Sequence, residues 1–260
     1  MIAPRLLIPK EHGAYGQLLV PLVSALLIGV PTAGAYLLAA AGTAAFLAHE
    51  GLLVQVGQRG SRAAREQQAE ARRSLALFGG FAAVTGTVSL FTLPTDALVW
   101  LGLPIVLGLA VAVAVFAHVE KTTGGEVLVG AALSSLSMPV ALGGEATAVA
   151  ARTLFLVFAL IFMTATVAVR AMIGRVTKAG GPPRWLALLL APAVLAVLAW
   201  LAARAELAEV APMAAIPVCV VSFALSVKPP SPRYLRPIGW TLVAATILTA
   251  IILVVGERLL

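Results

Sequence analysis

Charged residues are scarce in this chain of 260 residues, and their scarcity excludes a water-soluble fold. Asp, Glu, Lys and Arg make up 11% of the chain, whereas soluble domains contain roughly 25%. Polar side chains could not cover the folded surface, because 61% of the residues are hydrophobic and the mean hydropathy is +1.02. The composition therefore predicts an integral membrane protein.

Cysteine and aspartate each occur once. Cys219 lies within an apolar run, which excludes a disulfide framework and a cluster of thiolate metal ligands. Asp96 alone cannot form an aspartate-rich, metal-binding motif. A nucleic-acid partner is not expected either, because the basic residues form neither a soluble basic domain nor an ordered basic stripe.

Long apolar runs fill most of the chain and predict an all-α membrane domain over residues 1–260. A helix needs about 20 mostly apolar residues to cross a bilayer. The first run lacks the order of a cleavable signal peptide, so we interpret it as a retained helix. Nine membrane-spanning helices are predicted, over residues 14–31, 36–56, 74–93, 97–117, 126–143, 151–172, 185–203, 209–227 and 238–256.

The basic residues are distributed unevenly over the predicted loops, and this predicts the orientation. With a cytoplasmic N-terminus, fifteen Lys and Arg lie inside, and only Arg152, Arg204 and Arg258 lie outside. Six acidic residues lie inside and five outside, so the faces carry +9 (15 minus 6) and −2 (3 minus 5). The positive-inside rule then predicts a multi-pass membrane protein with its N-terminus in the cytoplasm, its C-terminus outside and the lipid bilayer as its partner. No oligomeric state is indicated.

Each of the three histidines has a glutamate next to it or two residues away, and all are predicted on the cytoplasmic face. His49 and Glu50 lie about six residues before the end of the second predicted span, which places them roughly 9 Å from the end of that helix. Adjacent helical residues point about 100° apart, so these two should reach toward other helices. We therefore predict one polar pocket with candidate catalytic residues Glu11, His12, His49, Glu50, His118 and Glu120.

Three roles for this group stay open. Histidine nitrogen and glutamate oxygen suit zinc or non-haem iron, although no H-x-x-x-H or E-x-x-H spacing is present, and no metal ligand or cofactor is assigned. Histidine titrates near neutral pH, which suits acid–base chemistry. Hydrogen bonding between helices is the purely structural alternative.

Basic side chains follow the cytoplasmic ends of the second, fourth and sixth spans, and they predict a rim that binds an anion. Anchoring by the positive-inside rule is the alternative explanation of the same charges. The turn "TTGGE" adds backbone donors before the fifth span. Residues predicted to bind substrate are Tyr15, Gln17, Arg59, Arg62, Lys121, Thr122, Arg170 and Arg175, with Lys178 as a further member of the rim.

Two resemblances add expectations. "IPKEHGAYGQLLVPL", "AHEGLL" and "YLRPIGW" resemble the YwiC-like family of bacterial membrane proteins, which implies a multi-pass protein of the bacterial cytoplasmic (inner) membrane. "HVEKTTGGEVLVGAALSSLSMPVALGG" resembles the stretch after the fourth helix of the UbiA superfamily of membrane prenyltransferases. This second resemblance implies a nine-helix UbiA-like bundle, with Lys121 and Thr122 touching a substrate diphosphate. The two aspartate-rich, magnesium-binding motifs of those enzymes are replaced here by "AHEGLLVQVGQRGSR" and "VRAMIGRVTKAGG".

The pocket and its rim predict a protein that binds an isoprenoid or quinone-type lipid, without the usual magnesium–diphosphate site. A divergent prenyltransferase-like transferase is the enzyme class that would also modify this lipid. A proton-coupled transporter is an alternative, although no inverted repeat is visible. A noncatalytic subunit of a respiratory membrane complex is another.

Overall fold

The computed structural model describes residues 6–9, 12–30, 32–175 and 181–259. This part of the chain is helical and contains no strand, which confirms the predicted all-α class. The helices are α1 (His12–Ile28), α2 (Ala33–Gln55), α3 (Ser61–Glu66), α4 (Gln68–Ser74), the π-helix η1 (Leu75–Gly79), α5 (Gly80–Leu90), α6 (Thr95–Trp100), α7 (Gly102–Phe116), α8 (Thr123–Ser135), α9 (Ser137–Gly143), α10 (Ala148–Gly174), α11 (Arg184–Ala203), α12 (Ala211–Val227), the 3₁₀-helix η2 (Pro232–Tyr234) and α13 (Leu235–Leu259).

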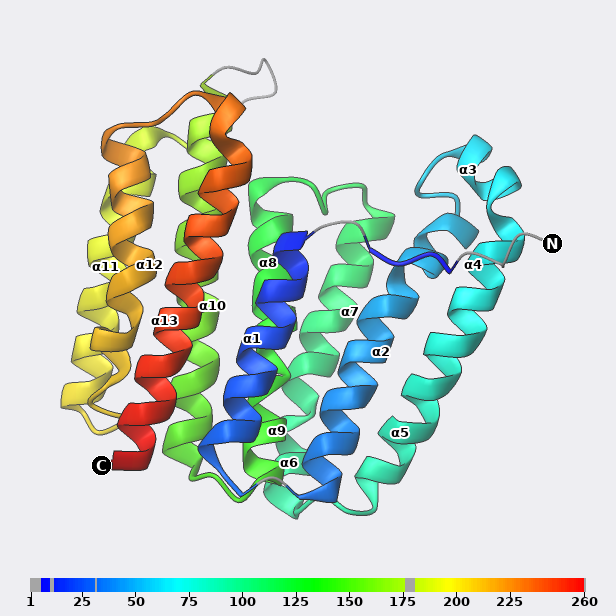
Figure 1. Ribbon diagram of the computed structural model, residues 1–260, viewed down its shortest axis with the longest axis horizontal. Helices are drawn as coiled ribbons and strands as arrows, with labels where there is room; N and C mark the ends of the chain where they lie inside the picture. The colour runs from blue at the N-terminus through cyan, green and yellow to red at the C-terminus, as the bar shows by residue number, and fades with distance from the viewer. Residues whose placement is uncertain (1–5, 10–11, 31, 176–180, 260) are drawn as a thin grey trace.

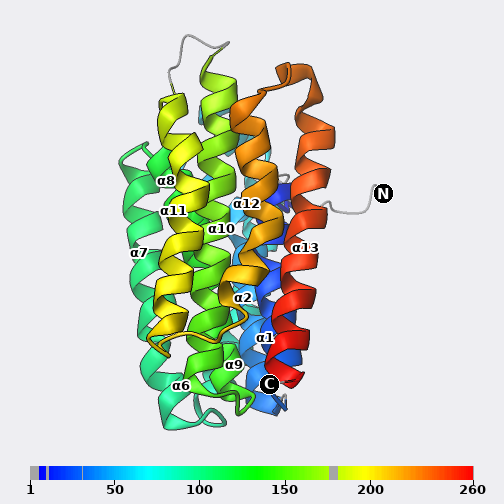
Figure 2. The same cartoon turned by 90° about the vertical axis from the view of Figure 1, so that its left-hand side faces the viewer.

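The described residues form seven helical segments that are long and apolar enough to cross a membrane, so a multi-pass membrane protein is confirmed. These segments are α2, α4 to α5, α6 to α7, α8 to α9, α10, α11 and α13. Two shorter apolar helices, α1 and α12, have 17 residues each and lie beside the longer ones (Figures 1 and 2). Together they match the nine predicted spans.

The third span begins six residues earlier than predicted. Its first part, α4, is polar and carries Arg72 and Arg73, so a search for apolar residues did not include it. The π-helix η1 joins α4 to α5 without a break. The span therefore extends beyond its apolar core as a helix with charged side chains.

Most of the basic side chains lie at the end of the bundle where α1 begins, at the top of Figure 1. We call this end the basic end. The described Lys and Arg there are Arg59, Arg62, Arg65, Arg72, Arg73, Lys121, Arg170, Arg175, Arg184, Lys228, Arg233 and Arg236. Because α13 finishes at the opposite end, the arrangement suits an odd number of crossings (Figure 1). The assignment of the basic end to the cytoplasm stays a prediction.

The three arginines at the opposite end have local partners. The Arg258 Nε–H donates to the carbonyl oxygen of Leu27 at 2.8 Å, near the end of α1. The Arg204 guanidinium lies 4.9 Å from the centre of the Trp200 ring and pairs with a glutamate two residues later. Arg152 donates to a carbonyl of its own helix. Each of these three arginines therefore has a local contact that accounts for a basic residue at the end of the bundle where few others lie.

Helices α1 and α10 lie at the centre of the bundle. Helix α1 packs against α2, α8, α9, α10 and α13, while α10 also packs against α11 and α12 (Figures 1 and 2). The largest fully buried side chain, Phe158, belongs to α10 and stacks on Phe162. Helices α2, α5 and α7 lie on one side of α1, and α11 to α13 lie on the other (Figure 1).

At the end opposite the basic end, the α1–α2 connection is joined to the end of α9 by backbone contacts. The Val30 N–H donates to the Gly144 carbonyl at 2.8 Å, and the Thr32 hydroxyl donates to the Gly143 carbonyl at 2.6 Å. Gly29 lies so close to the Gly144 carbonyl oxygen that a Cβ atom would overlap with it. We call these five residues the backbone seal, because they join three spans with little room for side chains.

Candidate functional site

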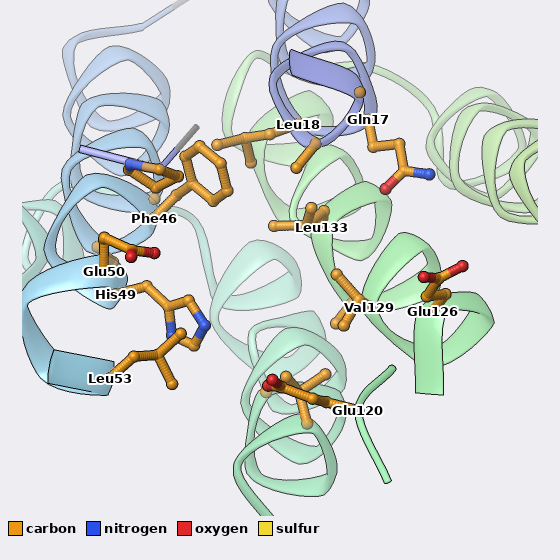
Figure 3. A pocket seen from close by; sticks show the side chains of 18 of the residues that line it. Gln17, Leu18, Phe46, His49, Glu50, Leu53, Glu120, Glu126, Val129 and Leu133 are labelled. Atoms are coloured by element: carbon orange, nitrogen blue, oxygen red, sulfur yellow. The ribbon is translucent and has the colours of Figure 1, made fainter. Parts of the chain in front are cut away.

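A cavity of about 730 Å³ lies between α1, α2, α7 and α8 near the basic end (Figure 3). Its size is within the range of small-molecule sites. Along α8 and the residue that follows it, the lining runs from Glu126 to Leu136, and ten helical residues correspond to about 15 Å. The cavity therefore reaches roughly halfway across a hydrocarbon core of about 30 Å.

The ionisable side chains of the lining all lie toward the basic end, where apolar residues such as Leu53 lie among them. The deeper part is mostly apolar, with residues such as Phe46 and Leu133, and Thr166 of α10 also contributes to the lining. Of the predicted site residues, six line this cavity: Gln17, His49, Glu50, Arg59, Glu120 and Lys121. His49 of α2 and Glu120 of the α7–α8 connection face the same space in Figure 3.

One wall of the cavity is charged through the pairing of Glu50 with Arg59. The Arg59 Nε–H and Nη2–H donate to the two carboxylate oxygens of Glu50 at 2.9 and 2.6 Å. The pair is only partly exposed to water, with 15% of the Glu50 side chain and 28% of the Arg59 side chain accessible. Such bidentate, charge-assisted hydrogen bonds are among the stronger ones in proteins.

The end of α2 explains how two residues nine positions apart can meet. Gly57 has a φ of +76°, a backbone conformation that glycine adopts without strain. Its N–H donates to the Val54 carbonyl, and the Gln58 N–H donates to the Leu53 carbonyl. This Schellman turn ends α2 and reverses the chain, so that Arg59 returns to Glu50.

A second pair of the same kind lies across the cavity. Arg170 of α10 donates from Nε to Glu126 of α8 at 2.7 Å, and its Nη2 donates to the other oxygen of the same carboxylate. The Arg170 Nη2 also donates to the Lys121 carbonyl at 2.5 Å. The guanidinium therefore joins α8, the turn before it and α10. Glu126 lines the cavity although it was not among the predicted site residues, and the acidic first turn of α8 was the available signal.

His118 does not join the cavity lining in the described residues. Its φ is +58°, and it occupies the left-handed position after α7. The His118 N–H donates to Val115 and the Val119 N–H to Ala114, which is the hydrogen-bond pattern of a Schellman turn. Because of this turn, the His118 imidazole is exposed. The closeness of His118 to Glu120 in the sequence did not predict this exposure.

Thr122 has a defined role in the backbone. Its hydroxyl oxygen accepts from the Gly125 N–H at 3.1 Å, and its hydroxyl donates to the Val119 carbonyl at 2.7 Å. It is thus the N-cap of α8. Because a Cβ atom on Gly125 would overlap with the carbonyl oxygens of Val119 and Glu120, the turn is also tightly packed.

The remaining predicted residues lie around or away from the cavity. The Tyr15 hydroxyl donates to the Pro9 carbonyl at 2.9 Å, and its ring meets the edge of Phe46, so Tyr15 supports two lining residues. Arg62 is exposed and pairs with Glu66, and Arg175 is exposed at the end of α10. Glu11 and Lys178 lie outside the described residues, as does the side chain of His12, which begins α1. The described residues contain no group of three or more His, Cys, Asp and Glu that could hold a metal ion.

The four walls of the cavity are not equally joined. Helix α1 packs against both α2 and α8, and α8 packs against α7. Within the described residues, no substantial packing joins α7 to α2 or to α5. The cavity lining includes Pro104, Gly108 and Val111 of α7 and Ala45 of α2, so the cavity occupies the space between these two helices.

Comparison with known proteins identifies the part of the chain that contains these walls. A family model described as YwiC-like protein matches residues 8–142, which extend from the segment before α1 into α9. No curated protein and no solved structure matches the chain. The UbiA-like arrangement of the helices stays a prediction.

Proposed function

The chain belongs to the YwiC-like protein family, and we propose that the region matched by the family model forms a binding site for an amphipathic isoprenoid or quinone-type lipid. The observation that carries this proposal is that the ionisable groups of the cavity lining lie toward the basic end, whereas the deeper lining is mostly apolar. A lipid with one polar head and one apolar tail has the same division. The side of the cavity between α2 and α7 would admit the tail directly from the bilayer.

The tail would lie along the apolar part of the lining. Leu18, Phe46, Leu133 and Leu136 contribute this surface from three helices. Burial of apolar surface away from water contributes about 25 cal/mol per Å² to binding. A lipid tail that moves from the bilayer core into the cavity was not in contact with water, so it gains little from this effect. The fit of the tail to the cavity should therefore decide which lipid is bound. The head would lie among Gln17, His49, Glu120 and Lys121 near the basic end. We place this end in the bacterial cytoplasm, in accordance with the positive-inside rule.

The proposal concerns binding. Chemical modification of the lipid would need a second reactant, and no observed group specifies one. A proton-coupled transporter would need a polar route that continues beyond the cavity. In the part of the chain that the structure describes, the deep lining is mostly apolar, and beyond it the backbone seal joins α1 and α2 to α9. Binding therefore has more support than transport.

A matched pair of substitutions on α7 tests the proposal. Val111 lines the cavity, whereas Leu109 of the same helix is exposed and lies outside the lining. The full chain would be purified gently, and the lipids that it retains would be identified by mass spectrometry. We expect Val111→Trp to lose the retained isoprenoid or quinone-type lipid and Leu109→Trp to keep it. Equal retention by the two variants, or no such lipid in the unaltered protein, would contradict the proposal.

A further inference from the structure

A second hollow, with a volume of about 600 Å³, lies between α1, α2 and the start of α5. We call it the apolar groove; it extends from Leu19 to Leu26 on α1, from Tyr36 to Leu47 on α2, and from Leu77 to Phe81 on η1 and α5. In the described part of the chain, no residue lines both the apolar groove and the cavity. The two hollows therefore lie on different faces of α1 and α2.

The lining of the apolar groove suits a hydrocarbon chain. Tyr36 and Thr43 are the polar residues among its described members, and the Thr43 hydroxyl donates to the Ala39 carbonyl of its own helix at 2.9 Å. The other described members are apolar side chains of α1, α2, η1 and α5. A ligand with many polar groups would find few partners there.

Two exposed arginines lie beside the end of the apolar groove that is nearer the basic end. Arg72 and Arg73 of α4 precede Leu77 and Phe78 by about one helical turn on the same continuous segment. The ion pairs formed among the described residues include neither guanidinium. Basic side chains next to a groove between membrane helices are typical of sites for anionic lipid headgroups.

The length of the groove matches one lipid. Gly51 of α2 lies close to the Ala71 carbonyl and to Ser74, and this register brings Leu47 level with Leu77. From that level the groove follows α2 to Tyr36 for about 16 Å, and Arg73 lies about 6 Å on the other side of it. The whole distance is close to half of a bilayer that is about 40–45 Å thick with its headgroups.

The groove wall also contains an unusual backbone element. Leu77 and Phe78 belong to the π-helix η1, which joins α4 to α5 beside α2 (Figure 1). A π-helix is rare and frequently marks a functional site. Its position at the upper end of the groove, between the arginines and the apolar lining, is a second observation that points to a ligand.

We propose that the apolar groove binds one anionic phospholipid of the leaflet beside the basic end, with its phosphate at Arg72 and Arg73 and an acyl chain between α1, α2 and α5. A guanidinium suits this role because its donors match the oxygen atoms of a phosphate. The inference goes beyond the proposed function, since it assigns a second lipid of different chemistry to a separate face of the protein.

The headgroup is tested with phosphatidylglycerol and phosphatidylcholine that carry the same acyl chains, bound to the purified full chain and measured by native mass spectrometry. We expect phosphatidylglycerol to bind at least about tenfold more tightly, because each basic side chain near a membrane surface favours an anionic lipid by about fivefold. Arg72→Gln combined with Arg73→Gln should reduce this ratio by about tenfold. Arg62→Gln combined with Arg65→Gln is the matched control, since it removes two exposed arginines of α3 and should leave the ratio unaltered.

Equal binding of the two phospholipids to the unaltered protein would overturn the inference. An equal fall of the ratio in the two double variants would overturn it as well, because the preference would then follow the net charge of the protein and not a site.

The groove is tested by a matched pair of substitutions. Ala40 lines the apolar groove, whereas Ala83 of α5 is exposed and lies outside the described lining. Ala40→Trp should weaken phosphatidylglycerol binding and Ala83→Trp should leave it unchanged. Thr43→Phe is a second groove variant if Ala40→Trp does not fold. Unchanged binding in the groove variants would refute the assignment of the acyl chain.

The cavity variant Val111→Trp separates this inference from the proposed function. It should keep phosphatidylglycerol bound while it loses the isoprenoid or quinone-type lipid. Loss of phosphatidylglycerol from Val111→Trp would contradict a separate site in the apolar groove.

Discussion

Two Arg–Glu pairs at the basic end differ in their exposure to water, and we expect their coupling energies to differ several-fold. Arg59 and Glu50 line the cavity, are 28% and 15% exposed and share two hydrogen bonds. Arg62 and Glu66 are 85% and 60% exposed and share one hydrogen bond within α3. The second pair is therefore a control with the same residue types in the same protein.

The structure sets the expected size of each energy. A hydrogen bond to a charged group contributes about 1.5–3 kcal/mol to stability. Partial exposure of Arg59 allows solvent to screen the first pair, so we expect its coupling energy to be about 2 kcal/mol rather than the sum for two such bonds. Exposed pairs four residues apart on a helix contribute about 0.3–0.5 kcal/mol, which is the value expected for Arg62 and Glu66.

A double-mutant cycle measures both energies. The unaltered protein, the two single alanine variants and the double variant of each pair would be unfolded in mixed detergent, and the free energy of unfolding would be compared. The cycle cancels contributions that each side chain makes to other groups. A coupling energy for Glu50 and Arg59 no larger than that for Arg62 and Glu66 would refute the reasoning.

Three further predictions concern backbone positions. His118→Gly should raise the free energy of unfolding by about 1 kcal/mol, because glycine adopts the left-handed conformation without the cost borne by histidine. Gly57→Ala should lower the free energy of unfolding by about the same amount. The melting temperatures of the two variants should therefore shift in opposite directions. Thr122→Ala should lower the free energy of unfolding by about 1 kcal/mol through loss of the N-cap of α8, and Thr122→Ser should restore most of this loss. If Thr122 instead bound substrate directly, Thr122→Ala would reduce ligand affinity without a change in stability. Gly29→Ala should destabilise the protein by about 2 kcal/mol, because the added methyl group meets a backbone oxygen that cannot rotate away; a melting temperature equal to that of the unaltered protein would contradict the tight packing of the backbone seal.

The membrane class and the number of spans could be predicted because both depend on the length of apolar runs. The predicted start of the third span was wrong, because the helix continues beyond the apolar run into α4, which is polar and carries Arg72 and Arg73. The glutamate and histidine of the second span could be predicted as cavity residues, because ionisable groups placed well inside a span need partners or water. His49 and Glu50 do line the cavity.

Other features of the site depend on helix register or on local backbone geometry, neither of which the residue pattern reveals. Glu126 and Arg170 are 44 positions apart, and their pairing follows from the relative register of α8 and α10, which no motif records. His118 was expected in the pocket because of its neighbours in sequence, but a left-handed residue after α7 turns it to solvent. Thr122 was expected to touch substrate, and its hydroxyl instead bonds to the backbone on both sides. Short-range backbone geometry thus decided which of the polar residues reach the cavity.

The cavity and the backbone seal lie toward opposite ends of the bundle, so the lipid site that we propose would be one-sided with respect to the two leaflets. From Leu136, at the floor of the cavity, about 12 Å of helix separates the lining from Gly144, where α1, α2 and α9 are joined through their main chains. A lipid bound there as proposed would exchange with the leaflet beside the basic end. Molecules of the same lipid in the other leaflet would have to flip before they could be bound. Occupancy of the cavity would therefore report the supply of that lipid in one leaflet and not in the membrane as a whole.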